Sequence, residues 1–465
     1  MNVVKNAGKR RAKKRFSQEQ SSQQNSAKKK ILFVAMQNSP HACRWINSIA
    51  ATDYELHLFA IDNNPPLPAL KSVTIHWPFI KKPGVQPSSL RGWVRSTLRT
   101  AWHWATATPR DYGSSALTYA AIYPMPLFPL IQLLLHRIPI RIGNAKTKVS
   151  LIHGPRTLAR LIRQLKPDLI HSMEFQHCGY VVLEAKKYCL ETFPTWLASN
   201  WGSDIYYYRQ FADHRAQISR LLRTADYYLC ECHRDIQLAN QLGMTAKALP
   251  VIPNTSGFDL DHAHRLRTMT PTSQRKTLMI KGYQHFAGRV LTALAAVERC
   301  AEVVKDFQII IFSASPEAIA RADELRSHTT IQNIKILPHT SHEAMLEAFS
   351  QARVYLGVSI SDGISTSVLE AMAMGAFPIQ TNTACCDEWF EHEEGGYIVE
   401  PDDTDTIAAR LNSALCDDAL VNCASEVNWR TITTRLDQRD FSQRVSRLYE
   451  QIFQEISSSF LSVDL

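Results

Sequence analysis

The sequence of 465 residues lacks several patterns that would place it in a common class of protein. Its ten cysteines form no Cys-x-x-Cys pair, and neither Cys230 and Cys232 nor the adjacent Cys385 and Cys386 have a spacing typical of zinc sites or disulfide frameworks. We interpret all ten as reduced core thiols of a cytoplasmic protein. Residues 1–30 contain no apolar run of the kind found in secretory signals. No Gly-x-Gly-x-x-Gly follows the first predicted strand, so a dinucleotide site has no support there.

The composition is that of a globular protein with room for two domains. Hydrophobic residues make up 45% and charged residues 20% of the chain. The net charge of +9 is unevenly distributed: residues 1–30 hold ten lysines and arginines against one glutamate, and residues 71–149 hold eleven against one aspartate. The basic character therefore belongs to the N-terminal tail and to one internal region.

The first thirty residues are rich in lysine, arginine, glutamine and serine and contain few large apolar groups. Such a segment cannot offset the entropy cost of ordering, so we expect residues 1–30 to be disordered. The basic run at residues 9–15 is compatible with a nuclear signal, a nucleic-acid tail, a tether to anionic lipid or a plain solvated tail. No aromatic-basic reading platform accompanies it, so we predict no nucleic-acid partner.

From residue 30 the pattern is that of an α/β protein. We predict a buried strand over residues 30–37, a loop over 38–43, a helix over 44–51, and further strands at 55–62 and 73–78. Strand, loop, helix and strand at this spacing open a doubly wound sheet. The same alternation returns at residue 153, and a second series of strands and helices begins near residue 276.

Residues 81–150 interrupt this alternation. Arg91, Arg95 and Arg99 fall on one helical stripe beside an apolar one, and three tryptophans lie nearby. A basic amphipathic helix with tryptophans is typical of a membrane surface. The following twenty-one residues, 116–136, are uncharged apart from a final histidine, but three prolines argue against one continuous membrane-spanning helix. We predict a segment that docks on or inserts shallowly into an anionic membrane; the alternative is an ordinary apolar cap between domains.

The most informative stretch is residues 352–381. It predicts a buried strand over 354–358, a small-residue loop over 359–365, a helix over 366–374 capped by Gly375, and a strand over 377–380. A helix that follows such a turn presents backbone N–H groups and its positive end to an anion. Ser365, Thr366 or Ser367 could cap the helix. Asp362 and Glu370 place one acid on each side of this phosphate cradle.

The residues of this stretch resemble the acid-x7-acid signature of the family 4 retaining glycosyltransferases. The matching residues are Asp362, Gly363, Leu369, Glu370, Ala371, Met372, Ala373 and Gly375, with Pro378 one position late. The family most often has glutamate where Asp362 stands. Weaker similarities occur at residues 166–168, 202–204, 225–226 and 253–259.

The resemblance implies the GT-B fold, an α/β architecture of two Rossmann-like doubly wound domains that face each other across a cleft. We expect an acceptor-side domain over residues 31–255, with the insertion at 81–150, and a nucleotide-sugar domain over residues 256–435. Residues 436–465 would form a helix that crosses back to the first domain; its apolar positions from Phe441 to Ile456 recur at helical spacing.

The resemblance also implies site residues. The catalytic candidates are Asp362, Glu370 and, on the acceptor side, Asp204. The predicted donor-binding residues are Gly363, Ile364, Ser365, Thr366, Lys281, Arg289 and Glu370. The predicted acceptor-side residues are Ser39, His41 and Gly202. No metal or other cofactor is expected, because family members need none, and the Asp259-x-Asp261 pattern follows the hinge where the family has a structural segment.

These residues predict a retaining glycosyltransferase that moves a sugar from a nucleotide-diphosphate donor to a lipid-linked or glycan acceptor. Assembly of a cell-surface polysaccharide or lipopolysaccharide, at the inner face of the membrane, is the predicted setting. Two alternatives stay open. A nucleotide-sugar 2-epimerase would share the fold but need no acceptor, and a non-catalytic protein would bind the nucleotide-sugar without turning it over.

Overall fold

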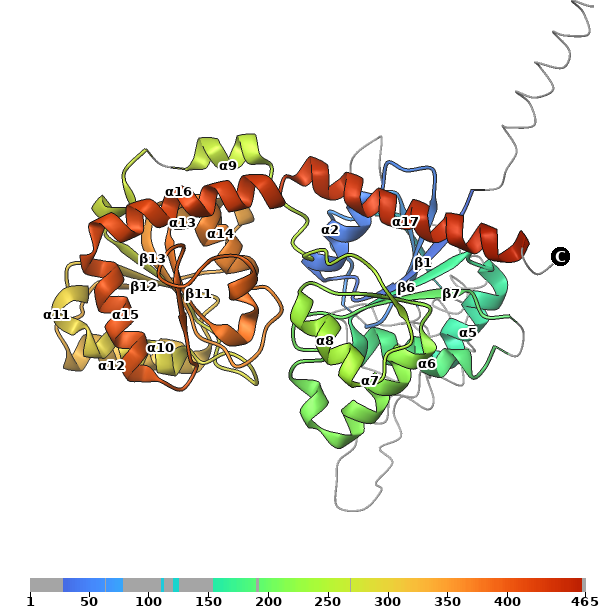
Figure 1. Ribbon diagram of the computed structural model, residues 1–465, viewed down its shortest axis with the longest axis horizontal. Coiled ribbons are helices and arrows are strands. Elements are labelled where there is room, and N and C mark those ends of the chain that lie inside the picture. The colour runs from blue at the N-terminus through green and yellow to red at the C-terminus, as the bar shows by residue number, and fades with distance from the viewer. Residues whose placement is uncertain are drawn as a thin grey trace, which may run out of the picture.

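The computed structural model describes residues 28–62, 64–77, 110–112, 120–124, 154–189, 192–267 and 269–461. These residues form two α/β bodies (Figure 1). They are joined by the hinge, which is the segment at residues 249–259 between β9 and α9, and by the C-terminal helices. We call them the N-terminal domain and the C-terminal domain. Each is built on one sheet of mainly parallel strands.

Nine strands of the described residues form the sheet of the N-terminal domain, in the order β4-β5-β3-β2-β1-β6-β7-β8-β9. All neighbours are parallel except β4 and β5. The strands are β1 (Lys30–Ala35), β2 (Glu55–Ala60), β3 (Val73–Trp77), β4 (Arg110–Tyr112), β5 (Ala120–Pro124), β6 (Leu169–Met173), β7 (Thr195–Ser199), β8 (Tyr227–Leu229) and β9 (Lys247–Ala248). The helices are α2 (Pro40–Ser48), α5 (Gly154–Leu165), a π-helical turn (Phe175–Gly179), α6 (Tyr180–Lys186), α7 (Ala212–Thr224) and α8 (His233–Gln241).

The sheet of the C-terminal domain has the order β12-β11-β10-β13-β14-β15, with all neighbours parallel. Its strands are β10 (Thr277–Lys281), β11 (Gln308–Phe312), β12 (Ile334–Leu337), β13 (Ala352–Gly357), β14 (Phe377–Thr381) and β15 (Tyr397–Val399). The helices of this domain are α9 (Leu260–Leu266), α10 (Val290–Arg299), α11 (Ala301–Val304), α12 (Pro316–His328), α13 (His342–Ser350), α14 (Thr366–Met374), α15 (Thr404–Cys416) and α16 (Asp418–Arg435). Helix α17 (Gln438–Leu461) follows them in the chain.

Both sheets reverse their strand order at one point, as Rossmann-like sheets do. The reversal lies between β1 and β6 in the first sheet and between β10 and β13 in the second. In open parallel sheets, ligands bind beyond the carboxyl ends of the strands at this reversal. The segments that follow β10 and β13 are therefore the first place to look for a ligand in the C-terminal domain.

Each sheet is covered on both faces, so the core of the described residues falls into four apolar clusters. Along β1, Phe33 belongs to the cluster under α2 and α17, while its neighbours Leu32 and Val34 belong to the opposite cluster under α5 to α8. In the second sheet, Leu278 and Met279 divide in the same way. Alternate residues of a strand point to opposite faces, which explains this division.

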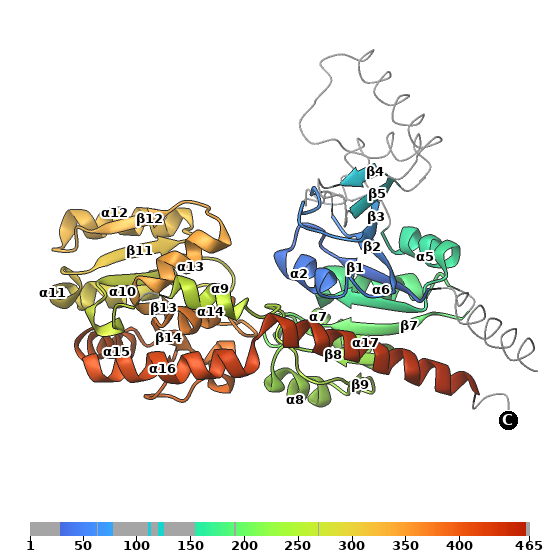
Figure 2. The ribbon, with the colours of Figure 1, turned by 90° about the horizontal axis from the view of Figure 1, so that it is seen from above.

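The C-terminal helix α17 returns to the N-terminal domain. It follows α16 directly and runs along the first domain beside α2 (Figure 1; Figure 2 shows the same from above). Its buried face, from Phe441 to Phe453, joins the core under α2. Tyr449 is completely buried, and its hydroxyl accepts a hydrogen bond from Trp45 Nε1 at 2.9 Å and lies 2.7 Å from His171 Nδ1. The end of the chain thus completes the core of its first domain.

Four sequence-based expectations need correction. Helix α2 begins at Pro40 rather than at residue 44, because Ser39 caps it and proline suits the first turn of a helix. Lys30 is the first residue of β1, as the predicted strand over residues 30–37 has it, so the predicted disordered tail over residues 1–30 is too long at its end. Residues 120–124 of the apolar run, for which no strand is predicted, form β5, whose backbone pairs with β3 in the sheet. Two of the ten cysteines, Cys416 and Cys423, are exposed rather than in the core.

The remaining expectations for the basic regions fall on other parts of the chain. Residues 1–27, the predicted amphipathic helix around Arg95 and all of residues 125–150 lie outside the described residues. Among the helices that the structure does describe, none combines the length and the apolar character needed to cross a bilayer.

Candidate functional site

The stretch singled out in the sequence has the predicted structure. Strand β13 ends at Gly357, the loop leads to α14, and α14 covers the predicted residues Thr366–Met374. Gly375 ends the helix in the left-handed conformation, with φ at 80°. A side chain there would meet Ser425 Oγ at 2.6 Å, which gives a second reason for glycine at this position. The loop and the start of α14 lie beyond the carboxyl end of β13, at the reversal of the sheet.

Lys281 is the last residue of strand β10, and its side chain reaches the start of α14. Its Nζ lies 3.1 Å from Ser365 Oγ and 3.5 Å from Asp362 Oδ2. Burial lowers the pKa of Lys281, but the charge of Asp362, the nearby tyrosines and the hydrogen bond to Asp362 outweigh it, so the pKa lies above its usual value. A cation is thus held at the start of α14. Ser365, which precedes the helix, bonds to this cation instead of capping the helix with its side chain.

The loop at Asp362 touches the N-terminal domain. A Cβ on Gly202 would collide with the N–H of Gly363 and lie 2.8 Å from Asp362 Oδ1. Nearby, Ser361 Oγ donates to Ser203 Oγ at 2.9 Å. The Gly363 N–H itself donates to Asp362 Oδ1 at 2.9 Å. The two domains are therefore in direct backbone contact beside the cation.

Arg234, in the first turn of α8, stabilises this contact between the two domains. Its guanidinium donates to the carbonyl oxygens of Asp362 at 2.9 Å and Thr383 at 2.8 Å, both in the C-terminal domain. It also pairs with the buried Asp235 at 3.0 Å and lies over the ring of Tyr206, 4.0 Å from its centroid. Burial opposes the charge of Arg234, but Asp235 and the neighbouring thiols outweigh it and hold the pKa above its usual range.

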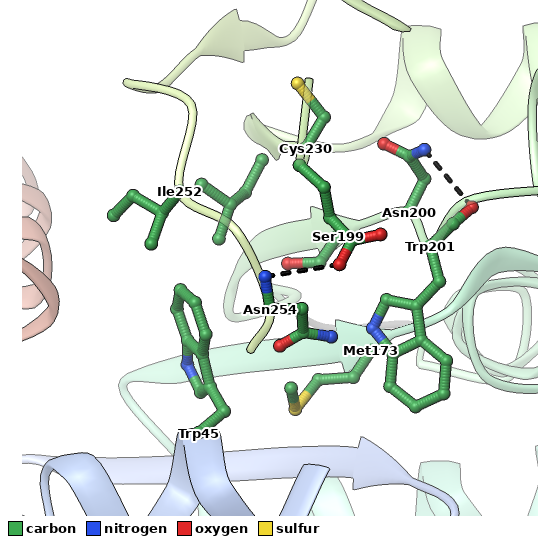
Figure 3. A pocket seen from close by; sticks show the side chains of 10 residues that line it. Trp45, Met173, Ser199, Asn200, Trp201, Cys230, Ile252 and Asn254 are labelled. Carbon is green, nitrogen blue, oxygen red and sulfur yellow. Dashed lines mark hydrogen bonds between the residues drawn. The ribbon is translucent and has the colours of Figure 1, made fainter. Parts of the chain in front are cut away.

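Glu231 lies between the same two loops. Its carboxyl oxygens accept the N–H groups of Gly202 and Asn254, each at 3.2 Å, and a Cβ on Gly363 would lie 2.6 Å from Oε2. Burial, with the negative charge of Asp362 second, raises the pKa of Glu231 to about 8. A neutral carboxylic acid therefore lies at the interface near pH 7. It also lines a small cavity beside Trp45, Trp201 and Asn254 (Figure 3).

Glu370, the second acid of the sequence pattern, lies in the second turn of α14. Its side chain is buried to 8% exposure, and Oε1 lies 2.9 Å from Nε2 of His342, the first residue of α13. The histidine is more exposed, with 48% of its side chain accessible. Glu370 is thus held by a partner at the protein surface, where a ligand could replace that partner.

The side chains of two other predicted donor-binding residues, Ile364 and Arg289, make their contacts within the protein. Ile364 is buried in the core beneath α14, so only its backbone could face a ligand. The guanidinium of Arg289 donates to the carbonyl oxygens of His285 at 2.9 Å and Gly288 at 2.8 Å. Its hydrogen bonds thus close its own loop, whereas those of Lys281 reach the start of α14.

Two of the predicted acceptor-side residues, Ser39 and His41, follow β1, whereas Gly202 follows β7. Ser39 caps α2 by accepting the N–H of Ala42 at 3.4 Å. His41 follows in the first turn, with Nδ1 3.3 Å from the carbonyl oxygen of Asn254 and its ring 5.7 Å from that of Trp201. Burial lowers the pKa of His41, and the positive charges of Arg44 and Lys281 act in the same direction; the hydrogen bond to Asn254 and the charge of Asp362 oppose them but are outweighed. His41 is therefore neutral near pH 7 and lies close to the contact between the domains.

The geometry does not support a catalytic role for Asp204. The residue is 4% exposed, and Oδ2 accepts the backbone N–H groups of Phe175 at 2.9 Å and Trp201 at 2.7 Å. Burial and the neighbouring Glu174 raise the pKa of Asp204 well above its usual value. Asp204 fixes the loop that carries Gly202, since its carboxyl oxygen is committed to that backbone.

Solved structures with the same fold cover nearly the whole chain. Sucrose-phosphate synthase from Thermosynechococcus elongatus is 14% identical with a TM-score of 0.64, over 92% of this chain and 100% of that one. Trehalose 6-phosphate synthase from Burkholderia multivorans is 12% identical with a TM-score of 0.61, over 93% and 98%. The Anabaena protein HepE, in complex with UDP-glucose, is 11% identical with a TM-score of 0.57, over 91% and 99%. At these identities the likeness shows the fold.

Two family models match the sequence. Residues 276–417 match the family described as glycosyl transferases group 1, and residues 130–231 match the family described as glycosyl transferase 4-like. The chain is a glycosyltransferase of the GT-B fold. No curated protein matches it in sequence. The first family match covers the elements from β10 to α14, and with them Lys281, Asp362 and Glu370.

Sequence reasoning missed three residues of this glycosyltransferase site. Glu231 lies between β8 and α8, Arg234 lies in the first turn of α8, and His342 opens α13. Their position was a usable signal, because charged residues that directly follow a strand of a parallel sheet lie at the edge where ligands bind. Their partners in other segments, which are 23 to 154 residues away in the chain, could not be read from the sequence.

The raised pKa of Glu231 predicts a pH dependence of stability. In the folded glycosyltransferase the carboxyl keeps its proton up to about pH 8, whereas an unfolded glutamate releases it near its usual pKa of 4.5. The unfolded state therefore binds fewer protons in between, and the free energy of unfolding falls as pH rises from about 4.5 to 8. We expect Glu231→Gln to lack this contribution. Denaturant unfolding at pH 5, 7 and 9 should show the variant gaining stability relative to wild type; a constant difference would contradict the assignment.

Proposed function

We propose that this glycosyltransferase transfers a sugar, with retention of its anomeric configuration, from a nucleotide-diphosphate donor to a lipid-linked or glycan acceptor. The observation that carries the proposal is the position of Lys281, held at the start of α14 between Ser365 and Asp362. A cation and a helix N-terminus directed at one point form a binding site for a diphosphate.

The diphosphate is the group that most needs stabilisation. Negative charge grows on it as the bond to the sugar breaks, and preorganised donors placed where this charge develops lower the barrier. Lys281 and the backbone N–H groups of Ile364, Ser365 and Thr366 would supply these donors, since the Gly363 N–H already donates to Asp362. This arrangement needs no metal ion, so we propose that the reaction uses none.

The two acids would hold the rest of the donor. Glu370 would accept hydrogen bonds from the ribose hydroxyls of the nucleotide, taking the place of its present partner His342. Asp362, beside Lys281 and opposite Gly202, would contact hydroxyls of the transferred sugar. The acceptor would then approach from the N-terminal domain, where Ser39 and His41 lie at the end of β1.

Replacing Glu370 with alanine is expected to abolish the stabilisation that the donor provides. A ligand that binds only the folded state raises the unfolding midpoint by mass action. We would compare the midpoints with and without UDP-, GDP-, ADP- and CMP-sugars for wild type, Glu370→Ala and the matched control Glu347→Ala, an exposed glutamate of α13. One nucleotide class should raise the midpoint of wild type and control only. A shift of equal size in Glu370→Ala would place the ribose elsewhere.

We also propose that the basic region around residues 91–99 binds an anionic membrane surface, which would bring the enzyme to a lipid-linked acceptor in cell-surface glycan assembly. Each arginine near such a surface contributes about 1 kcal/mol of attraction. Replacing Arg91, Arg95 and Arg99 with glutamine should release the protein from vesicles that contain anionic lipid. Sedimentation with neutral vesicles is the control, and unchanged binding of the triple variant to anionic vesicles would refute the membrane proposal.

The two alternatives differ in their products. A nucleotide-sugar 2-epimerase would form product from the nucleotide-sugar alone, whereas a transferase requires an acceptor. A non-catalytic protein would show the donor-induced shift without any product. Incubating the identified donor with and without a glycan acceptor extract, followed by mass analysis, separates these outcomes.

A further inference from the structure

Two cysteines meet across the contact between the domains. Cys232 belongs to the N-terminal domain, where it is the cap residue of α8, and Cys385 belongs to the C-terminal domain, where it precedes a short helical turn. The two residues are 153 positions apart, yet their Sγ atoms lie 3.0 Å from each other. Both are almost inaccessible, with exposures of 0% and 2%. The proposed transfer of a sugar makes no use of either thiol.

Residues next to this cysteine pair also form the contact between the domains that holds the loop at Asp362. Glu388, three residues after Cys385, accepts the backbone N–H groups of His233 at 2.7 Å and Arg234 at 3.3 Å. Arg234 follows Cys232 by two positions and donates to the carbonyl oxygens of Asp362 and Thr383. The thiols therefore lie within the same set of contacts that holds Asp362 against Gly202.

A metal ion is the first alternative, because Cys232, Cys385 and Glu388 offer three ligand atoms within 4.8 Å. Three features disfavour it. The guanidinium of Arg234 lies beside both sulfur atoms and would repel a cation. Glu388 Oε1 is already occupied by two N–H groups. Two sulfur atoms at 3.0 Å are also closer than two thiolates that share one zinc ion, since each Zn–S bond is about 2.3 Å in a tetrahedral site.

We propose that Cys232 and Cys385 are a site of oxidative modification at which a disulfide joins the two domains. The bond would fix the contact between Gly202 and the loop at Asp362. Because that loop forms part of the proposed donor site, donor and product could not exchange freely while the bond is present. The enzyme would then be switched off by oxidation and restored by thiol reductants.

The chemistry requires the domains to separate first. In the closed arrangement the hydrogen bond between the thiols, together with burial, raises the pKa of Cys232, so the sulfur stays protonated and unreactive. When the domains part, Cys232 is left at the N-terminus of α8, a position that favours the thiolate. The thiolate attacks hydrogen peroxide to give a sulfenic acid and hydroxide. On closure the Cys385 thiol displaces the sulfenic oxygen as water, and one disulfide forms for each peroxide consumed.

Peptide mapping of the full-length chain tests the proposal. The exposed Cys416 and Cys423 are first replaced with serine, because they would otherwise consume peroxide. Peroxide treatment should then remove two thiols per chain and yield a cross-link between the tryptic peptides at residues 224–234 and 354–410. Each of these peptides holds two cysteines. The cross-link should therefore persist in the matched controls Cys230→Ser and Cys386→Ser and disappear in Cys232→Ser and Cys385→Ser.

Activity provides the second readout. Peroxide should abolish turnover of the background enzyme, dithiothreitol should restore it, and Cys385→Ser should keep its turnover under the same treatment. The proposal is overturned if oxidation leaves both thiols free, if they pair with other cysteines, or if the purified protein holds a metal ion whose removal by a chelator is needed before oxidation. The mapping requires no substrate, so it stands or falls separately from the proposed sugar transfer.

Discussion

Replacing Lys281 with methionine is expected to lower kcat/KM for the true donor by about 10²–10³-fold, the usual cost of removing one preorganised donor from a charge-stabilising site. Methionine keeps the length of the side chain but carries no charge and cannot donate to a phosphate. The residue is part-buried, and its Nζ lies within 3.5 Å of both Ser365 and Asp362. Water therefore could not easily take its place. The fall should appear mainly in kcat, because the charge on the diphosphate is largest in the transition state.

The control for this change is Lys335→Met, the same substitution at an exposed position of β12 in the same sheet. It should leave kcat and KM unchanged. If Lys281→Met retained nearly full activity, the diphosphate would have to be bound by another cation. Arg289 would then be the next residue to replace, although its guanidinium now closes its own loop through the carbonyl oxygens of His285 and Gly288.

The structure of residues 352–381 was predictable because each of its elements depends on residues close by in the sequence. The strand, the small-residue turn, the helix over residues 366–374 and the glycine at 375 all depend on neighbours within a few positions, and the structure confirms them. The two-sheet fold also followed from the alternation of strands and helices, because short connections and right-handed crossovers leave few topologies open. The start of α2 was misplaced, since Ser39 and Pro40 were assigned to a loop although together they are a helix-start signal.

Contacts between the domains could not be predicted in this way. The partners of Arg234 in the C-terminal domain are 128 and 149 residues away, and the thiol pair is separated by 153. Periodicity reports which face of an element is buried but not which distant loop covers it. Asp204 shows the same limit in reverse. The family resemblance implies an acceptor-side role for it, but in the structure its Oδ2 accepts two backbone N–H groups and so shapes the Gly202 loop.

The domain contact itself leads to the second large effect, which we expect from Gly202→Ala. A Cβ at this position would collide with the N–H of Gly363 and lie 2.8 Å from Asp362 Oδ1 and 2.9 Å from the carbonyl carbon of Asp362. Backbone atoms cannot yield as a flexible side chain can, so the domains would have to move apart. Displacing a reacting group by about 1 Å can cost on the order of 10² in rate. We therefore predict that kcat falls by about 10²-fold.

Donor binding separates this effect from a loss of folding. Lys281, Glu370 and the start of α14 all belong to the C-terminal domain, so the donor should still raise the unfolding midpoint of Gly202→Ala as it does for wild type. Gly202 is not among the residues with positive φ, so alanine fits its backbone and each domain should still fold. The ligand-free midpoint should fall only by the stability that the contact between the domains contributes. Gly154→Ala is the control, because the nearest neighbour of its Cβ among the described residues would be Val181 at 4.0 Å. Full activity in Gly202→Ala would mean that catalysis does not require this contact, whereas a lost donor shift would mean that the N-terminal domain takes part in holding the donor.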